Sequence, residues 1–277
     1  MTSREIGLAA ADGYALGATL YGAPSKRAVL VMAASGVPQT YYARFALHLV
    51  AHGFQVLTFD YRGIGRSRST SVRKLPARMR DWALLDGAAA LAALDHAEKV
   101  IVVGHSFGGQ SLGLLQRDGR IGAALLVGSQ SAYWRNYPLR GRLWVWPSAH
   151  FLLPGITRVF GYFPGSRLGF GEDLPPGVAI EWARWCRHPT YLVGDLRAED
   201  AYARFSAPVR AYALTDDAFA PPSAVRALLD LLPAAKSELR RVTPAEVGAK
   251  SIGHFGFFRE RFRDTLWREA CEWLTRH

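Results

Sequence analysis

The 277-residue chain has little cysteine and no long uninterrupted apolar run. Its two cysteines, Cys186 and Cys271, are too few for a disulfide framework, and they lack the spacing of metal ligands. No stretch of about 18 apolar residues is present, so we expect no membrane-spanning segment. The N-terminal residues lack a basic stretch followed by an apolar run, so we expect no signal peptide. The chain is therefore expected to be cytoplasmic and to hold no metal.

Lysine is scarce as well, because only five of the 34 basic residues are lysines and the other 29 are arginines. The net charge of +11 would suit nucleic acid or an anionic surface. However, the basic residues are spread along the chain rather than run together. We therefore expect no nucleic-acid partner and only a weak attraction to anionic surfaces.

The glycine motifs that bind nucleotides are also missing. The spacing Gly63-x-Gly65 matches the start of a dinucleotide-binding motif, but the third glycine would fall at Arg68, and no helix clearly opens there. A phosphate-binding P-loop is absent too. The sequence therefore predicts no nucleotide, and we expect the protein to work without a cofactor.

What the chain does contain is an alternation of apolar, β-branched runs with helix-like stretches. Four runs between residues 28 and 127 are almost continuously apolar, as is typical of parallel strands buried on both faces. The alternation predicts an α/β fold with a doubly wound, mostly parallel eight-stranded sheet, and the first two runs predict an antiparallel hairpin at its edge. The predicted strands are Glu5–Ala9, Leu16–Tyr21, Ala28–Ala33, Gln55–Phe59, Val100–Val103, Ala123–Val127, Val209–Thr215 and Ser237–Val242. The predicted helices are Tyr41–His52, Met79–His96, Phe107–Arg117 and a last one with the apolar stripe Phe258, Phe262, Leu266, Ala270 and Trp273.

The alternation stops between residues 131 and 206, a segment that holds five of the eight tryptophans. It is too long for a structureless loop in a compact domain. We expect a mostly helical cap over residues 131–206, inserted into a core formed by residues 1–130 and 207–277. In this interpretation Trp144, Trp146 and Trp182 line a substrate pocket. The alternative is a second small domain with its own core that is unrelated to any site.

The most informative segment is Gly104-His105-Ser106-Phe107-Gly108, which fits the pattern G-x-S-x-G. An apolar β-branched run precedes it and a small-residue helical run follows it. This strand–turn–helix context predicts a serine hydroxyl exposed on a tight turn, with glycines where a Cβ would collide with neighbouring elements. Ser106 is therefore the candidate nucleophile.

A serine hydroxyl needs a base, and the base needs an acid that fixes its tautomer. Where a serine stands on such a turn, the acid and then the histidine follow it in the chain. His254, in the loop between the last strand and the last helix, fits this order best. The loop after the strand Val209–Thr215 offers two carboxylates. We expect Asp217 to be the acid, because it stands four residues before a proline, and Asp216 remains the alternative.

Acyl transfer also needs backbone N–H groups directed at the developing oxyanion. Phe107, the residue after the nucleophile, is one expected donor. The second is expected from the loop after the third strand, Ala34-Ser35-Gly36-Val37-Pro38. Val37 is our candidate, since Pro38 has no N–H to donate.

These segments together resemble the α/β-hydrolase superfamily with a serine nucleophile, over essentially the whole chain. The resemblance rests on residues 104–109, 60–67 and 216–221 and on the His254 loop. Two further stretches, 174–177 and 181–186, are similar to a bacterial group related to the serine aminopeptidase and monoacylglycerol-lipase-like hydrolases. The resemblance implies an α/β-hydrolase fold with an inserted helical cap.

The chain departs from that pattern in one place, because Ser35-Gly36 stands where many relatives carry His-Gly. The expected oxyanion donors are backbone groups, so this difference should leave them intact. Epoxide hydrolases and haloalkane dehalogenases have an aspartate where this chain has Ser106, so neither chemistry is expected.

The sequence and the resemblance together predict a cofactor-free serine hydrolase for a small ester with an apolar acyl or alcohol part. One alternative keeps the same three residues but acts as an acyltransferase, or as a peptidase or amidase that releases small residues. An alternative from another class is a non-catalytic binding protein that retains the fold. The presence of Ser106, Asp217 and His254 together argues against that last possibility.

Overall fold

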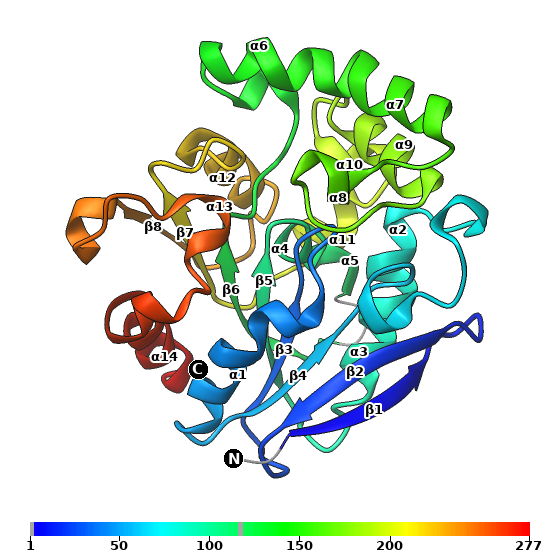
Figure 1. Ribbon diagram of the computed structural model, residues 1–277. Helices are drawn as coiled ribbons and strands as arrows, with labels where there is room; N and C mark the ends of the chain where they lie inside the picture. Colours follow the sequence, from blue (N-terminus) through cyan, green and yellow to red (C-terminus); the bar gives the residue numbers. More distant parts are fainter. Residues whose placement is uncertain (1–2, 116–118) are drawn as a thin grey trace.

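A computed structural model describes residues 3–115 and 119–277, and its centre is an eight-stranded sheet (Figure 1). The strand order is β1-β2-β4-β3-β5-β6-β7-β8. All eight predicted strands are present, with bounds that differ by at most two residues at either end. The strands are β1 (Ser3–Ala9), β2 (Ala15–Tyr21), β3 (Ala28–Met32), β4 (Gln55–Phe59), β5 (Val100–His105), β6 (Ile121–Val127), β7 (Val209–Leu214) and β8 (Ser237–Val242).

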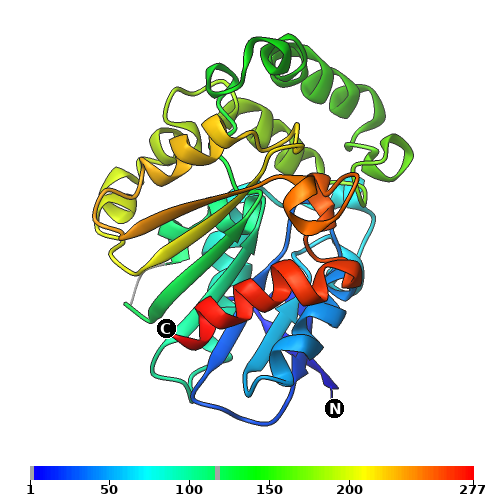
Figure 2. The same cartoon turned by 90° about the vertical axis from the view of Figure 1, so that its left-hand side faces the viewer.

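The sheet is mostly parallel, as the alternation predicted. Strands β1 and β2 form an antiparallel hairpin at one edge, and β2 also pairs antiparallel with β4. The other neighbours pair parallel. Every residue of β3, β4 and β5 is buried, because helices cover both faces of the sheet at its centre (Figure 1; Figure 2). Burial on both faces explains why these strands are continuous apolar runs in the sequence.

The helices of the core lie where they were predicted, but several of them are shorter than predicted or are broken into pieces. A π-helical stretch (Trp82–Gly87) joins α2 to α3, and the helix after Ser106 breaks at Ser111. The predicted end of that helix, at Arg117, lies outside the described residues. The core helices are α1 (Ala43–Val50), α2 (Met79–Asp81), α3 (Ala88–Ala92), α4 (Phe107–Gln110), α5 (Leu112–Leu115), α12 (Pro222–Leu229), α13 (Gly253–Gly256) and α14 (Arg268–Thr275). The apolar stripe predicted for the last helix is fully buried, which confirms that it packs in the core.

A helical insert lies between β6 and β7, and α6 and α7 form its outermost part (Figure 1). A π-helical turn (Ser148–Leu152) joins α6 to α7. The helices α10 and α11 belong to the same insert, yet α11 packs against α5 of the core. The division at residues 130 and 206 therefore stays a prediction. The insert helices are α6 (Leu139–Pro147), α7 (Leu153–Phe160), α8 (Gly165–Leu168), α9 (Pro176–Trp185), α10 (Tyr191–Asp195) and α11 (Glu199–Ala203).

The glycine-containing segment after β4 forms a turn held by a buried carboxylate. Asp60 accepts hydrogen bonds from the backbone N–H groups of Gln39 (2.7 Å) and Arg66 (3.0 Å). A Cβ on Gly65 would lie 2.6 Å from this carboxylate, so glycine is required there. Within residues 3–115 and 119–277, no helix has both the length and the apolar character needed to cross a membrane.

Candidate active site

Ser106 stands at the turn between β5 and α4, at the carboxyl end of a central strand. Its backbone has φ 50° and ψ −116°, and φ in this range is rare for a residue with a side chain. The N–H of Ser106 donates to the carbonyl oxygen of Val127 on the neighbouring strand (2.9 Å). This hydrogen bond and the helix that begins at Phe107 hold the strained turn, as the strand–turn–helix context predicted.

The glycines on both sides of Ser106 are required by close backbone contacts. A Cβ on Gly108 would overlap the carbonyl oxygen of Met32 on β3, and one on Gly104 would lie 2.5 Å from the backbone of Gly109. A larger residue at either position would push the turn away from the sheet. The G-x-S-x-G spacing therefore follows from the packing of α4 against β3 and β5.

His254 and Asp217 are joined by a hydrogen bond of 2.7 Å between Nδ1 of the histidine and Oδ2 of the aspartate. The second carboxylate oxygen of Asp217 accepts the backbone N–H groups of Phe219 (2.8 Å) and Ala220 (3.0 Å). Both side chains are buried. The pairing leaves Nε2 of His254 as the ring nitrogen available for proton transfer.

Asp216, the alternative acid, has a different task. Its Oδ2 accepts the backbone N–H groups of Ile252 (2.7 Å) and Gly253 (3.1 Å), which immediately precede His254. The carboxylate therefore anchors the histidine loop and does not contact the imidazole. Of the two aspartates that the sequence offers as the acid, the structure brings only Asp217 to His254.

Gly128, just after β6, makes room for this pair, which the sequence analysis did not recognise. Its φ is +55°, and a Cβ there would lie 3.1 Å from both the Asp217 carboxylate and Nδ1 of His254. Any larger side chain would press on the hydrogen bond between them. A glycine directly after a buried strand was the available signal, because such a glycine marks a close approach by another part of the chain.

Ser106 and His254 line one small cavity of about 40 Å³, together with Ala34, Ser35 and Phe255. Among the described residues, no hydrogen bond joins Oγ of Ser106 to the imidazole. Such hydrogen bonds are often long in structures without substrate and shorten in the complex. The three residues predicted from chain order thus come together from the turn after β5, the loop after β7 and the short helix α13.

Val37, the predicted second oxyanion donor, does not face the small cavity in this structure. Its N–H donates to the carbonyl oxygen of Ala34 (3.2 Å), so a turn already uses it, and Val37 does not line the cavity. Ser35 does line the cavity, and no described residue accepts its backbone N–H. Phe107 is the first residue of α4, where a helical N–H has no partner within the helix. The N–H groups of Ser35 and Phe107 are therefore the candidate pair.

His105 links the loop of Ser35 to the loop of His254. The Tyr42 hydroxyl accepts the N–H of Ala34 (2.9 Å) and lies 2.8 Å from Nδ1 of His105, while Nε2 of His105 lies 3.0 Å from the carbonyl oxygen of His254. Since a carbonyl only accepts, Nε2 carries the proton and Nδ1 accepts from Tyr42. Burial, and the neighbouring His254, hold the pKa of His105 well below its usual range. A neutral imidazole with one fixed tautomer therefore connects the two loops.

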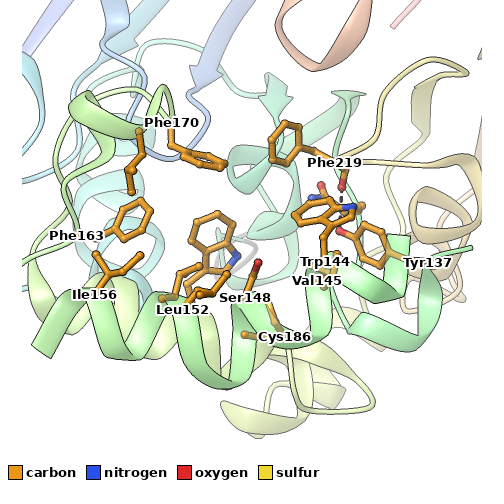
Figure 3. A pocket seen from close by; sticks show the side chains of 16 residues that line it. Tyr137, Trp144, Val145, Ser148, Leu152, Ile156, Phe163, Phe170, Cys186 and Phe219 are labelled. Carbon is orange, nitrogen blue, oxygen red and sulfur yellow. Dashed lines mark hydrogen bonds between the residues drawn. The ribbon is translucent and has the colours of Figure 1, made fainter. Parts of the chain in front are cut away.

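A second cavity, of about 280 Å³, adjoins the first, and its lining is predominantly apolar. Figure 3 shows Val145, Ser148, Leu152 and Ile156 on one run of helix, facing aromatic side chains across the cavity. The two cavities are neighbours that share five wall residues. The shared residues are Gln130, Phe163, Phe170, Trp182 and Phe219.

The three tryptophans predicted for the pocket do not all face it. Trp144 and Trp182 line the larger cavity, and Trp182 also lines the smaller one. Trp146 does not; its ring is 40% exposed and stacks on His150 with 4.7 Å between ring centroids. Residues two apart on an α-helix differ by about 200° in direction, so Trp144 and Trp146 cannot point into the same space.

The wall of the cavities also contains polar side chains that no sequence pattern predicted. Gln130 lines both of them, and its Oε1 accepts from Nε2 of Gln110 (3.0 Å), whose own Oε1 accepts from the Tyr191 hydroxyl (2.9 Å). Cys186 also lines the larger cavity, and burial raises the pKa of its thiol to about 12. The thiol therefore stays protonated at neutral pH. Since only the thiolate is nucleophilic, Cys186 contributes to the cavity as an apolar wall group and not as a nucleophile.

Metal-ligand side chains gather at another place. Among the described residues, one group of three could hold a metal ion: His48, His52 and Cys271, whose ligand atoms lie within 4.8 Å of one another. This group joins α1 and α14 and contains none of the residues around Ser106.

The fold and the turn at Ser106 agree with a known family. A family model described as "Alpha/beta hydrolase family" matches residues 28–264 of the chain. The chain belongs to the alpha/beta hydrolase family. This finding confirms the resemblance seen in the sequence, and the sheet with its helical insert confirms the predicted fold class. A search of curated protein sequences finds no match.

Solved structures with the same fold include enzymes of several kinds. DcsB in complex with its substrate analogue matches with a TM-score of 0.69 and 15% identity, covering 99% of each chain. An esterase of Pyrococcus furiosus matches with a TM-score of 0.66 and 14% identity, covering 99% of this chain and 91% of that one. A monoacylglycerol lipase of Paleococcus ferrophilus matches with a TM-score of 0.63 and 20% identity, covering 95% and 99%. At these identities the matches show the shared fold alone.

Proposed function

We propose that this alpha/beta hydrolase is a serine hydrolase that cleaves small esters with an apolar acyl or alcohol part, without a cofactor. Ser106 is the nucleophile, His254 the general base and acid, and Asp217 the group that orients the histidine. The backbone N–H groups of Ser35 and Phe107 form the oxyanion hole in this proposal. The larger cavity receives the apolar part of the ester.

The reaction follows from these roles. Oγ of Ser106 attacks the ester carbonyl carbon while its proton passes to Nε2 of His254. The Asp217 carboxylate holds the proton on Nδ1 and stabilises the imidazolium that forms. The alcohol leaves with the proton from Nε2, and the acyl group remains on Ser106. Water then attacks the acyl-enzyme with His254 as base, which releases the acid and restores the serine.

The observation that carries the proposal is the Asp217–His254 hydrogen bond of 2.7 Å, beside a serine held at positive φ. Both features cost folding free energy, because burying a carboxylate requires partners and the backbone at Ser106 is strained. Such a cost is typical of functional sites. The adjoining apolar cavity favours an uncharged, apolar group on the substrate. Esterases and a monoacylglycerol lipase among the structures of the same fold are consistent with this class.

Labelling with a fluorophosphonate probe tests the proposal, because the probe reacts with activated serines. We expect labelling of the wild-type protein and none of Ser106→Ala, together with hydrolysis of p-nitrophenyl esters by the wild type alone. Absence of labelling in a well-folded wild-type protein would overturn the proposal in favour of a binding protein. Labelling without release of acid to water would point instead to an acyltransferase.

A further inference from the structure

Exposed apolar side chains are concentrated in one part of the molecule. All the large hydrophobic side chains that are exposed, among the described residues, lie between residues 139 and 170 of the insert. Leu139, Leu143 and Val159 are more than 70% exposed, at 74%, 73% and 81%. We call this set the insert patch: Leu139, Leu143, Trp144, Trp146, Phe151, Leu152, Val159, Phe160, Leu168 and Phe170. A gathering of this kind on an otherwise polar surface marks an interaction site.

Along residues 119–171, which hold the whole insert patch, every charged side chain is basic. Residues 119–171 contain no aspartate or glutamate. All five arginines between residues 131 and 171 are exposed, and none pairs with an acidic side chain in the described structure. The five are Arg135, Arg140, Arg142, Arg158 and Arg167. Exposed apolar groups among unpaired cations are typical of segments that lie on anionic membrane surfaces.

The insert patch is also continuous with the cavity. Four members of the insert patch, Trp144, Leu152, Leu168 and Phe170, also line the 280 Å³ cavity. Figure 3 shows that the helical run with Val145, Leu152 and Ile156 directs these side chains toward the cavity. An apolar molecule leaving a lipid surface at this patch would therefore meet residues that belong to the cavity wall.

We propose that the insert patch and its five arginines dock the protein on an anionic phospholipid surface. A second copy of the chain is the competing occupant, since an apolar patch also suits a dimer. A two-fold contact through this patch would bring two sets of unpaired arginines together, without a carboxylate from residues 119–171 to neutralise them. Anionic headgroups supply the missing charge, so lipid fits better. Docking concerns where the protein acts and does not depend on the proposed ester chemistry.

Co-sedimentation of the full-length protein with vesicles tests the proposal. We compare phosphatidylcholine vesicles with vesicles that also contain phosphatidylglycerol, at low and high salt. Partitioning should rise by at least about tenfold with the anionic lipid and fall with salt, as screening weakens the attraction. Equal binding to both vesicle types, or no binding to either, would overturn the proposal.

Charge reversals away from the active site locate the contact. Arg140→Glu, Arg158→Glu and Arg167→Glu combined should lower binding to anionic vesicles by at least about tenfold. The matched control reverses the same amount of charge at three exposed residues outside the insert, Arg4 in β1 and Lys26 and Arg27 just before β3. The control should lose much less binding. An equal loss in both variants would mean that net charge alone attracts the protein, which contradicts a docking patch.

A second set of variants tests the apolar contribution and separates it from catalysis. Leu139→Ser, Leu143→Ser and Val159→Ser remove apolar surface without touching the cavity lining. Combined, they should reduce vesicle binding and leave turnover of a water-soluble short ester unchanged. Ser106→Ala should bind vesicles as the wild type does, whether or not it hydrolyses esters. A dimer that these serine variants dissociate in sedimentation velocity would overturn lipid docking in favour of self-association.

Discussion

The surroundings of Ser106 and the insert use opposite kinds of interaction. Around Ser106 the key polar atoms are buried and hydrogen-bonded, as in the Asp217 carboxylate with its three N–H partners. In the insert, apolar side chains face both the cavity and the solvent, and the five arginines between residues 131 and 171 pair with no described acidic side chain. The difference separates two requirements. Chemistry needs fixed polar geometry, whereas the choice and supply of an apolar substrate need adaptable apolar surface.

The two regions meet at a few defined contacts. The N–H of Glu172 donates to the carbonyl oxygen of Gly36 (2.7 Å), next to Ser35, and the Tyr137 hydroxyl donates to the carbonyl oxygen of Phe219 (2.8 Å). The ring of Phe219 in turn lies 5.3 Å from that of His254, between ring centroids. The insert thus contacts both the loop after β3, which holds Ser35, and the loop after β7, which holds Asp217. Variants in each region should show whether the surroundings of Ser106 determine the rate of the reaction and the insert determines the choice of substrate.

The largest effect is expected from the residues that form and break bonds. Ser106→Ala or His254→Ala should each lower kcat by about 10⁴-fold or more, because neither residue works without the other. The double variant should be little slower than either single one, measured with a short p-nitrophenyl ester. Losses that multiply in the double variant would show that the two residues act independently and would contradict the assignment.

The next largest effect separates the two neighbouring aspartates. Asp217→Asn should lower kcat by roughly 10³-fold or more, because an amide would no longer hold the catalytic tautomer of His254. Asp216→Asn keeps an oxygen for the N–H groups of Ile252 and Gly253, so we expect less than about a tenfold loss in the same ester assay. A larger loss at Asp216 would reverse the roles that we propose.

Much of the fold could be predicted because the sheet is buried. Strands covered on both faces must be apolar along their whole length, and β3, β4 and β5 are recognisable for that reason. Helix ends were less predictable, since the π-helical stretch Trp82–Gly87 depends on packing against other elements. Chain order and loop position were enough to bring Ser106, Asp217 and His254 together, because the ends of parallel strands meet at one edge of a sheet.

Val37 and Trp146 are the two predicted site residues that do not line the cavities, and the reason in each case is local direction rather than position in the chain. The backbone turns after β3 so that the N–H of Val37 faces Ala34, and the sequence does not reveal which N–H in a loop stays unpaired. Trp146 and Trp144 are two residues apart, and helical geometry alone would have placed them on different sides. Gln110 is the last residue of α4 and Gln130 lies in the loop after β6, so no local sequence pattern joins these two side chains.

Histidine titration should produce a smaller effect, on stability. Burial keeps His105 neutral in the folded state, whereas an unfolded imidazole binds a proton below about pH 6.5. The unfolded state then holds more protons, so the unfolding free energy should fall as pH drops from 7 to 5, by up to about 1.4 kcal/mol per pH unit. His48, whose pKa burial also lowers, adds to the slope.

The contribution of His105 can be isolated with His105→Gln, whose amide can donate to the His254 carbonyl. Urea unfolding at pH 7, 6 and 5 should give a shallower pH dependence for this variant than for the wild type. His48→Gln should reduce the slope independently, because the two histidines share no partner. Identical slopes in the wild type and His105→Gln would mean that His105 is not the neutral link between the two loops.

The smallest effect should come from the insert, and it should appear as selectivity rather than as loss of turnover. A methylene buried against the cavity wall stabilises the complex by about 0.8 kcal/mol, which is roughly fourfold in kcat/KM per added carbon until the cavity is full. Phe170→Ala and Trp182→Ala enlarge the space next to Ser106, so the chain length at which kcat/KM peaks should increase across acetate, butyrate and octanoate esters. Turnover of the acetate ester should change little, since these side chains leave the Asp217–His254 pair intact. Trp146→Ala is the matched control, because it removes an indole outside the cavity and should leave the preference unchanged. An unchanged preference in folded Phe170→Ala and Trp182→Ala proteins would show that the insert does not select the substrate, and the division of tasks between the two regions would fail.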